Sequence, residues 1–497
     1  MAAGTACAQF ADVPRPATPD NAYDQATANP VQSHWAPRLL QGAEHAADRA
    51  PLAATDTTAG ILQTGGLDAW PRLYRGGDLL ITGSLTGTAA GFKMWNNEFG
   101  VPPSLQTHGY ATNPGWGEFF LEPGLSATYK VSAQASVYGG FSYLEASTRG
   151  RDNAGSDNVW YGNRELLYAG AKWRDADSGF ALDVSYGQQN FHVGNGMLLW
   201  SGASNGGQRG ANYLGPRGAW ATAGVVKGTW KEMAVQGFYL KPNDASADAT
   251  GTTLVGVNFD WHGTGPLRVG AMYVHVPESD IVTRNGLNIY DLRARWHPVV
   301  ASPRFWLDGE YVWERKASVA AEGWYVQANY NATDTTWKPL LALRYAALSG
   351  ARSGSSRWQG FDPLYFGNGN PNWYQGKLGS TLFNNTNLNT ASAALTVTPT
   401  EKQILQFWYL YFSADQANSP LDIPAAGQPV PTGGGVPNKP LASEFDVAYT
   451  YTFSKSVNVN VVAAYATPGS GYKQLYSANS GSANGWWLLG TQFNISY

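Results

Sequence analysis

Cysteine, charged residues and long apolar runs are all scarce in this chain of 497 residues. The single cysteine, Cys7, excludes a disulfide within the chain. Charged residues make up 14% of the sequence, whereas roughly 25% is usual in soluble domains. No segment approaches the ~20 consecutive apolar residues that a transmembrane helix requires. These absences disfavour both a large soluble protein and a helical membrane protein.

Aromatic residues and glycine are abundant instead. The chain contains 20 Trp, 27 Tyr and 58 Gly, and aromatic residues form 13% of it. A transmembrane β-barrel needs aromatic side chains for two interfacial girdles and few charges on its outer wall. Only alternate strand residues face lipid, so a mean hydropathy of -0.30 is compatible with such a barrel. The net charge of -3 gives no electrostatic footprint for nucleic acid.

Residues 489–497, which end the sequence, alternate strictly between two kinds of side chain. The odd-numbered positions from Leu489 to Tyr497 are mostly apolar, whereas Gln492 and Asn494 lie on the other face. This period predicts a strand with one apolar and one wet face. A terminal aromatic residue on the apolar face resembles the signal that the outer-membrane barrel-assembly machinery recognises. We therefore expect this machinery to be a partner of residues 489–497.

The same alternation predicts about 18 strands, an even number as in single-chain bacterial barrels. The expected strands are 79–92, 117–129, 133–146, 164–174, 180–190, 217–230, 231–241, 252–262, 267–276, 287–297, 304–315, 321–331, 336–347, 388–398, 403–413, 443–453, 457–466 and 486–497. Short turns, as at 454–456, alternate with long segments, as at 191–216 and 348–387, which is the asymmetry of such barrels. The predicted fold class is therefore all-β: a transmembrane antiparallel up-and-down β-barrel of residues 76–497.

The first 75 residues have a different composition. Ala6 and Ala8 have the small-residue spacing of a signal-peptidase site, so we expect residues 1–8 to be the remnant of a signal peptide. Lipidation of Cys7 is the alternative. Residues 9–75 are rich in Ala, Pro, Asp and Thr and lack alternation, which predicts an N-terminal periplasmic extension or a partial plug of the pore.

Charged side chains recur on the polar faces of the expected strands. A charge facing lipid at the midplane would cost ~2–4 kcal/mol, so these side chains are expected to face a water-filled lumen. The predicted pore-lining residues are Lys172, Lys227, Arg268, Arg293, Arg295, Lys338, Arg344, Asp308 and Glu310. Arg293 and Arg295 lie two apart on one face and form a candidate basic patch for an anionic solute, because guanidinium binds carboxylate bidentately. Mutual bracing with Asp183, Asp260 or Asp291 is the structural alternative.

The long segment 348–387 carries several aromatic residues. The candidates for solute contact are Trp358, Phe361, Tyr365 and Trp373. If the segment folds inward, these rings would stack on sugars or aromatic solutes. The alternative is that they pack the loop against itself.

Catalytic motifs are weak. Residues 202–206 (Gly-Ala-Ser-Asn-Gly) match the nucleophile elbow in sequence, but a glycine-rich loop flanks them where a strand and a helix are needed. The histidines lack metal-site spacing, and no phosphate-binding loop or dinucleotide fingerprint occurs. We therefore predict a protein that is not an enzyme and holds no metal or cofactor. An outer-membrane hydrolase using Ser204 is the alternative from another functional class.

Two segments resemble the alginate-export family of outer-membrane barrels. Residues 186–191 (Tyr-Gly-Gln-Gln-Asn-Phe), followed by Gly-Asn-Gly-Met-Leu at 194–198, are similar to a family strand and the loop after it. Residues 361–367 (Phe-Asp-Pro-Leu-Tyr-Phe-Gly), preceded by Leu-Ser-Gly at 348–350, are similar to a long family loop bearing Phe-x-Pro-Leu.

The resemblance implies an outer-membrane location, a monomer, and passive export of an anionic uronate polysaccharide through a basic constriction. The predicted function is an outer-membrane channel for passive transport of anionic organic solutes or polysaccharide. An uptake porin for small sugars, organic acids or aromatics is the alternative.

Overall fold

The structure, a computed structural model, describes residues 71–497 apart from short gaps. The gaps are residues 101–109, 176, 247, 264, 300–303, 333–334, 368–372, 432–434 and 479–480. The expected signal-peptide remnant and most of the expected extension or plug lie outside the described residues and stay predictions.

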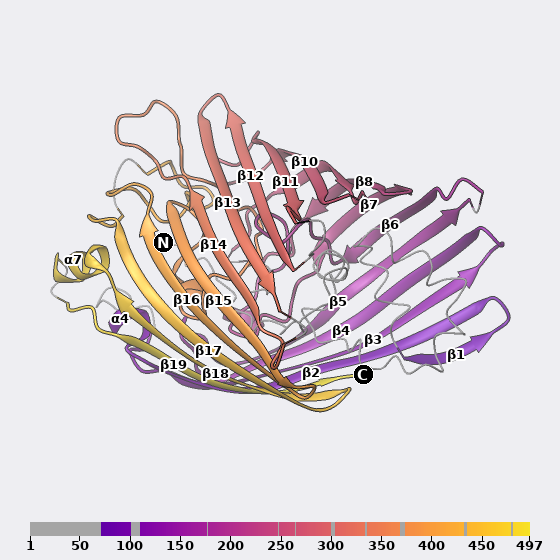
Figure 1. Cartoon of the computed structure of the whole chain (residues 1–497), viewed down its shortest axis with the longest axis horizontal. Coiled ribbons are helices and arrows are strands. Elements are labelled where there is room, and N and C mark those ends of the chain that lie inside the picture. The colour runs from indigo at the N-terminus through magenta and orange to yellow at the C-terminus, as the bar shows by residue number, and fades with distance from the viewer. Residues whose placement is uncertain are drawn as a thin grey trace.

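Antiparallel strands form one sheet that closes on itself (Figure 1). The first half of the wall comprises β2 (Leu79–Trp95), β3 (Gly115–Lys130), β4 (Ala135–Arg151), β5 (Asp157–Arg174), β6 (Ala181–Gln189), β7 (Trp220–Trp230), β8 (Met233–Lys241), β9 (Thr253–Trp261) and β10 (Leu267–Glu278). The second half comprises β11 (Asn288–Trp296), β12 (Phe305–Lys316), β13 (Val319–Asn331), β14 (Leu340–Leu348), β15 (Leu388–Thr400), β16 (Gln403–Ala414), β17 (Pro440–Ser454), β18 (Val457–Pro468) and β19 (Trp486–Ser496). Each strand pairs with the next, and β19 pairs with β2 from Trp487 opposite Trp95 to Ser496 opposite Thr86. The predicted antiparallel barrel of 18 strands is therefore confirmed.

A nineteenth strand, β1 (Arg72–Gly76), extends the sheet beyond the prediction. It pairs with the first residues of β2, where Gly76 stands opposite Leu79. The last residue of the chain, Tyr497, exchanges two backbone hydrogen bonds of 2.8 Å with Leu85 further along β2. β1 therefore supplies backbone partners to the stretch of β2 that lies beyond the end of β19.

The two faces of the strands differ in exposure as the alternation predicts. On β19, Leu489 and Phe493 are 48% and 47% exposed, whereas Gln492 and Asn494 are 2% and 3% exposed. The apolar face therefore points away from the barrel interior and the amide face points into it. A lipid environment suits this arrangement, because most side chains of the outer face are apolar.

The connections sort by length between the two ends of the barrel. The end that holds Tyr497 has short turns such as 131–134 and 401–402, and we call it the short-turn end. The opposite, long-loop end carries the connections 96–114, 190–219, 349–387, 415–439 and 469–485. Two connections at that end, 152–156 and 317–318, are short. The predicted sorting of connections thus holds for most strand pairs and fails at these two.

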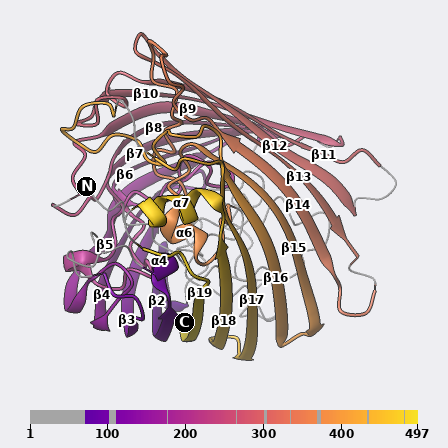
Figure 2. The ribbon, with the colours of Figure 1, turned by 90° about the vertical axis from the view of Figure 1, so that its left-hand side faces the viewer.

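Three short helices gather beside the long-loop ends of β2 and β19 (Figure 2). They are α4 (Asn97–Gly100), α6 (Gly379–Leu382) and α7 (Ser470–Ala478). The ring of Tyr472 in α7 lies 5.3 Å from Phe99 in α4 and 6.3 Å from Phe383, which follows α6. Aromatic packing therefore joins three connections that are far apart in the sequence.

Two of the long connections turn into the barrel. We call residues 190–219 inner segment A and the described residues of 349–387 inner segment B. The ring of Tyr213 in inner segment A lies 4.8 Å from Phe92 of β2, and Trp373 in inner segment B lies 5.4 Å from Tyr325 of β13. Both segments thus contact inward-facing side chains of the wall and form a core within the long-loop half.

Inner segments A and B also pair with each other across the lumen. The N–H of Trp200 donates to the carbonyl of Tyr365 at 2.8 Å, and the N–H of Gly367 donates to the carbonyl of Gly196 at 2.7 Å. Since each such bond satisfies a backbone group away from bulk water, the pairing fixes the two segments relative to one another.

Candidate functional site

Uncharged hydroxyl and amide side chains line one side of the lumen in its short-turn half, along β18, β19, β2 and β3. Thr88 donates a 2.8 Å hydrogen bond to Asn494, whose amide donates at 2.9 Å to Asn458. Thr82 and Ser126 share a 2.5 Å hydrogen bond between β2 and β3. These positions present dipoles without formal charge, and we call this side the neutral wall.

The opposite side, on β9–β12, carries a row of paired charges that we call the charged row. Arg293 donates to Asp291, and its Nη2 lies 3.3 Å from Oδ1 of Asp260. Arg295 donates from Nε to Oδ1 of Asp308 at 2.5 Å. The predicted basic patch therefore lies on an inward face, but each guanidinium is bound to carboxylate, as the structural alternative held.

Strand register places these charges together. Arg295 stands opposite Asp308, and Arg293 stands opposite Glu310 on one side and Gly270 on the other. A Cβ added to Gly270 would lie 2.8 Å from Nη2 of Arg293, so a larger residue would displace the guanidinium. Glu310 itself is buried at 6% exposure. The absence of a side chain at Gly270 gives Arg293 the room to reach its acidic partners.

A second group of charges crosses β5, β6 and β7 in one register row. Lys172 stands opposite Asp183, and Asp183 stands opposite Lys227. Tyr138 donates a 2.5 Å hydrogen bond to Asp183, and Nζ of Lys172 lies 5.2 Å from the Tyr138 ring. The carboxylate between two lysines again offsets the cations that the sequence places in the lumen.

The remaining predicted cations occupy three different environments. Arg268 lies on β10, half-buried and opposite Arg295. Lys338 is exposed in the turn before β14, which begins at Leu340, so the predicted strand at 336–347 starts too early and Lys338 is not on an inward strand face. The backbone φ of Lys338 is +45°, and this left-handed conformation ends the extended chain. Arg344 lies on β14, buried at 7% exposure.

Acidic side chains of the long-loop half hold the inner segments instead of facing water. Glu118 of β3 accepts hydrogen bonds from the backbone N–H groups of Tyr213 at 3.0 Å and Leu214 at 2.7 Å. Carboxylates that bind consecutive backbone amides make charge-assisted bonds, which are stronger than neutral ones. Glu118 thereby attaches inner segment A to the wall.

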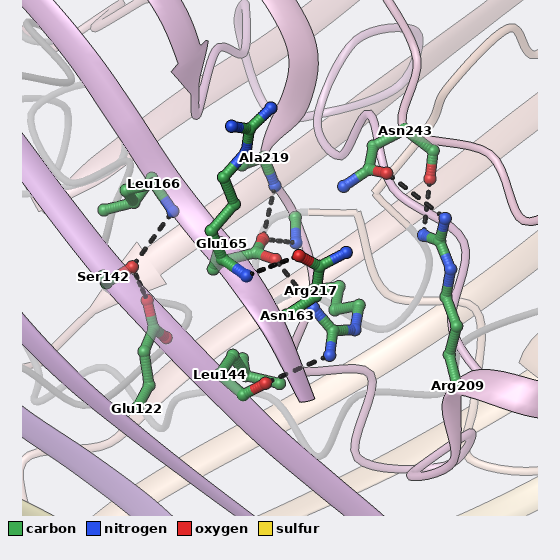
Figure 3. A network of polar contacts seen from close by, with 12 residues as sticks. Glu122, Ser142, Leu144, Asn163, Glu165, Leu166, Arg209, Arg217, Ala219 and Asn243 are labelled. Atoms are coloured by element: carbon green, nitrogen blue, oxygen red, sulfur yellow. Dashed lines mark hydrogen bonds and ion pairs between the residues drawn. The ribbon is translucent and has the colours of Figure 1, made fainter. Parts of the chain in front are cut away.

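Glu165 of β5 makes the second attachment of inner segment A (Figure 3). It accepts hydrogen bonds from the N–H groups of Gly218 at 2.7 Å and Ala219 at 2.8 Å. Nη1 of Arg217 lies 3.5 Å from the same carboxylate, and Nη2 donates to the carbonyl of Leu144 at 3.2 Å. Both charged side chains are almost fully buried, so removal of either one would leave the other as a buried charge without its partner.

Glu444 and Asp446 of β17 attach inner segment B in the same way. Glu444 accepts from the N–H groups of Leu378 and Gly379, both at 2.7 Å. Asp446 accepts from the N–H of Lys377 at 3.0 Å. These two carboxylates thus bind three consecutive backbone amides and fix the segment before α6.

A buried ion pair ties inner segment B to the connection after β10. Arg284 donates from Nε to Asp362 Oδ2 at 2.9 Å and from Nη2 to Oδ1 at 2.6 Å. Both side chains are 4% exposed. The N–H of Asp362 donates at 2.8 Å to Glu314 of β12, so the wall also binds this turn directly.

The predicted loop aromatics are packed within the barrel. Trp358, Phe361 and Trp373 are 7%, 0% and 0% exposed. Tyr365 is half-buried, and its ring lies edge-on to Trp220 at 5.0 Å. Inner segment B therefore folds inward, but its rings pack against the wall and do not form an open stacking surface.

Burial shifts the pKa of two groups in the inner segments. Desolvation lowers the pKa of Lys377 to about 8, although Asp446 and Glu444 act in the opposite direction. Desolvation and the nearby Lys227 lower the pKa of His192 to about 3. His192 is therefore neutral at pH 7, while Lys377 keeps most of its charge.

Sequence reasoning did not identify Glu118, Glu165, Glu444, Arg217 or Arg284. The three acids occupy inward positions of strands, and this place in the alternation is the only feature of the sequence that could have identified them. Their partners are backbone amides of distant loops, and alternation along a strand contains no information about those loops.

Metal-ligating side chains and Ser204 are the remaining candidates for chemistry in the sequence. In that part of the chain, no group of three or more His, Cys, Asp or Glu is placed to hold a metal ion. None of the described helices has the length and apolar character to cross a membrane. Ser204 lies in an irregular stretch of inner segment A, where its hydroxyl accepts a 3.1 Å hydrogen bond from the N–H of Ala245. The strand–turn–helix geometry of a nucleophile elbow is not present around Ser204.

Comparisons with known proteins support a barrel of this kind. A family model described as alginate export matches residues 150–485, which is more than half of the chain. The barrel is similar to Acinetobacter baumannii OccAB1, with a TM-score of 0.51 and 12% identity over 84% of this chain and 96% of that chain. It is also similar to Pseudomonas aeruginosa OccK7 (OpdD), with a TM-score of 0.49 and 11% identity over 85% and 99% of the two chains. At such low identity, the likeness to OccAB1 shows the fold alone. None of the curated proteins matches.

Proposed function

The chain belongs to the alginate export family and is an outer-membrane channel, and from that premise we propose that it carries sugar-like organic solutes, anionic ones among them, by passive diffusion. The observation that supports this most directly is the lumen itself. A neutral wall of hydroxyl and amide groups faces a charged row in which Arg293 and Arg295 are each bound to carboxylate. Such a surface exchanges hydrogen bonds with a hydrated solute without a strong field of one sign.

Ion selectivity in planar bilayers tests this proposal. The wild-type channel should conduct KCl and show only a modest preference for one ion sign in a salt gradient. Replacing both arginines (R293Q/R295Q) leaves Asp260, Asp291 and Asp308 without their cations, so the reversal potential should move towards cation selectivity. Lys338→Gln, which removes an exposed cation from a turn, is the matched control and should leave the reversal potential in place.

A protein that inserts but does not conduct would refute the channel mechanism. Strong anion selectivity that persists in R293Q/R295Q would refute the role of the charged row. Export of a uronate polymer is the second candidate, favoured by the family match. Oligo-uronates longer than the barrel should then block the current more strongly than monomeric uronate at equal carboxylate concentration.

We further propose that the protein acts as a monomer without enzymatic activity and that the barrel-assembly machinery recognises residues 489–497. The apolar face of β19, with Leu489, Phe493 and Tyr497 exposed, supports the last point. Deleting Tyr497 should lower the yield of heat-modifiable barrel in outer membranes while leaving the total protein made unchanged.

A further inference from the structure

Two cations near the long-loop end of the wall each lie beside an exposed tryptophan. Nζ of Lys93 on β2 lies 5.9 Å from the centre of the Trp95 ring. The guanidinium of Arg149 on β4 lies 5.5 Å from the centre of the Trp160 ring on β5. Both tryptophans are exposed. This part of the wall therefore carries two cation–aromatic pairs, an arrangement that holds a positive charge over a ring face.

Both cations point away from the lumen. The residues before them, Phe92 and Thr148, face the interior, where each contacts inner segment A. Since successive side chains of a strand point to opposite faces, Lys93 and Arg149 lie on the outer face. They belong to the surface that meets lipid and not to the lining of the pore.

The wall between the two cations carries no side chain. Gly91 of β2 stands opposite Gly117 of β3, and Gly117 stands opposite Arg149. A Cβ added to Gly91 would meet nothing within 4 Å, and one added to Gly117 would meet only the backbone oxygen of Ala90 at 3.5 Å. The surface between Lys93 and Arg149 is therefore open.

Lys93 and Arg149 are close enough to bind one ligand from two sides. Lys93 stands opposite Gly115, and Arg149 stands opposite Gly117, two residues further along β3. Strands lie ~4.8 Å apart and rise ~3.4 Å per residue, so the two Cα atoms are about 12 Å apart. Long side chains on both sides span such a gap when a small anion lies between them.

Neither cation is bound to a carboxylate of the described residues. Lys93 donates one hydrogen bond of 2.7 Å to the carbonyl of Asn113 and keeps two further N–H groups. The guanidinium of Arg149 has only the Trp160 ring as its partner in that part of the chain. Glu145, on the same face of β4, stands four residues further from the long-loop end. The two charges thus present an uncompensated positive surface.

The position of these cations along the strands corresponds to the outer leaflet. β2 ends at Trp95, where the connection 96–114 begins, and Trp95 stands opposite the exposed Trp487 of β19. In outer-membrane barrels the long loops face the cell exterior, and aromatic residues at strand ends mark the level of the lipid headgroups. Cations at this level meet lipid phosphates and avoid the cost of a charge at the midplane.

We propose that Lys93 and Arg149 bind a phosphate group of the phosphorylated glycolipid of the outer leaflet, whose anchor is lipid A. Guanidinium binds phosphate bidentately, and the lysine ammonium adds a point charge. The exposed faces of Trp95 and Trp160 suit the sugar rings that carry the phosphates, whereas a phospholipid headgroup offers no such ring. The inference concerns the outer wall and is independent of the solute carried through the lumen.

Native mass spectrometry of the folded barrel in detergent, titrated with lipid A that carries two phosphates, tests the proposal. The apparent Kd of K93Q/R149Q should be at least ~10-fold higher than that of the wild type, because hydrogen bonds from charged groups are the strong ones. Wild-type protein should bind phosphatidylglycerol, which has a phosphate and no sugar, several-fold more weakly than lipid A.

Two further variants separate a defined site from general attraction. R352Q/R357Q removes two exposed cations of inner segment B and is the matched control, which should bind lipid A as the wild type does. Gly117→Leu keeps both charges but places a side chain between them, so it should weaken binding several-fold. A heat-modifiable gel shift confirms that each variant forms a barrel, and Arg149→Gln replaces the double variant if that variant does not fold.

Three results would overturn the site. Equal Kd values for the wild type and K93Q/R149Q would show that these cations do not bind the lipid. An equal loss of binding in R352Q/R357Q would show that net charge alone is responsible. Phosphatidylglycerol bound as tightly as lipid A would refute the assignment to a glycolipid. None of these results bears on the channel function, since K93Q/R149Q changes the outer wall and should conduct KCl as the wild type does.

Discussion

The buried pair of Arg284 and Asp362 gives the sharpest prediction about the inner core. Asp362→Asn keeps the size of the side chain but leaves the Arg284 guanidinium, 4% exposed, without its carboxylate. Removing one partner of a buried ion pair typically costs ~3–5 kcal/mol. Because the pair joins inner segment B to the connection after β10, this cost should favour release of the segment while the barrel stays closed.

Trypsin cleavage after Lys377 measures that release. Lys377 is 3% exposed, so the protease reaches its peptide bond only when inner segment B leaves its place. Each ~1.4 kcal/mol changes a population tenfold, so a cost of ~3–5 kcal/mol should raise the released population by roughly two to three and a half orders of magnitude. The cleavage rate follows this population when the segment opens and closes faster than the protease cuts. Mass spectrometry of the peptide ending at Lys377 gives the rate.

Two further variants make the reasoning refutable. Replacing both members of the pair (R284M/D362N) should restore much of the protection, since the guanidinium that Asp362→Asn leaves buried without a carboxylate is then absent. Asp157→Asn, at an exposed position at the start of β5, should leave the cleavage rate unchanged. The explanation by buried charge is wrong if Asp362→Asn is cleaved at the wild-type rate, or if the double variant is as labile as the single one.

Three further predictions follow from other contacts. Gly376 has a φ of +86°, and a Cβ there would lie 2.5 Å from a Glu444 carboxylate oxygen, whereas a Cβ at Gly354, with a φ of +76°, would meet nothing within 4 Å. Gly376→Ala should therefore accelerate the tryptic cleavage more than Gly354→Ala does. Equal cleavage rates would show that the contact with Glu444 is unimportant. Burial raises the pKa of Asp152 from 3.8 to about 6, so the unfolded chain loses this proton at a lower pH than the folded protein does. The free energy of unfolding should therefore fall by up to ~3 kcal/mol between about pH 4 and pH 6 and level off above that range. Urea titrations of Asp152→Asn in detergent should show a flatter profile. Deleting Tyr497 should slow barrel assembly in vivo, and unaltered assembly would exclude a role for the terminal aromatic residue.

Much of the wall was predictable because its physics is local. The two-residue period of β19 separates Phe493 from Gln492 without reference to any other strand, and their exposures of 47% and 2% agree with that separation. The same rule found the 18 wall strands. It missed β1, since five residues ending in Gly76 are too short for a period to emerge. The two-residue period also placed the start of β14 too early, at residue 336, because the hydropathy pattern does not reveal the left-handed backbone at Lys338.

The sequence by itself determined the class of fold, the lipid-facing residues and the inward position of Arg293, Arg295 and Arg344, since side-chain direction in a strand follows from residue parity. Only the tertiary structure decided which of these cations are neutralised. That outcome depends on strand register, which sets Arg295 opposite Asp308, and on two loops folded into the barrel, which bring backbone groups to Glu118 and Glu444. Charge pairing acts over a few ångströms between residues far apart in the chain, so it is fixed by closure of the barrel and not by any local pattern.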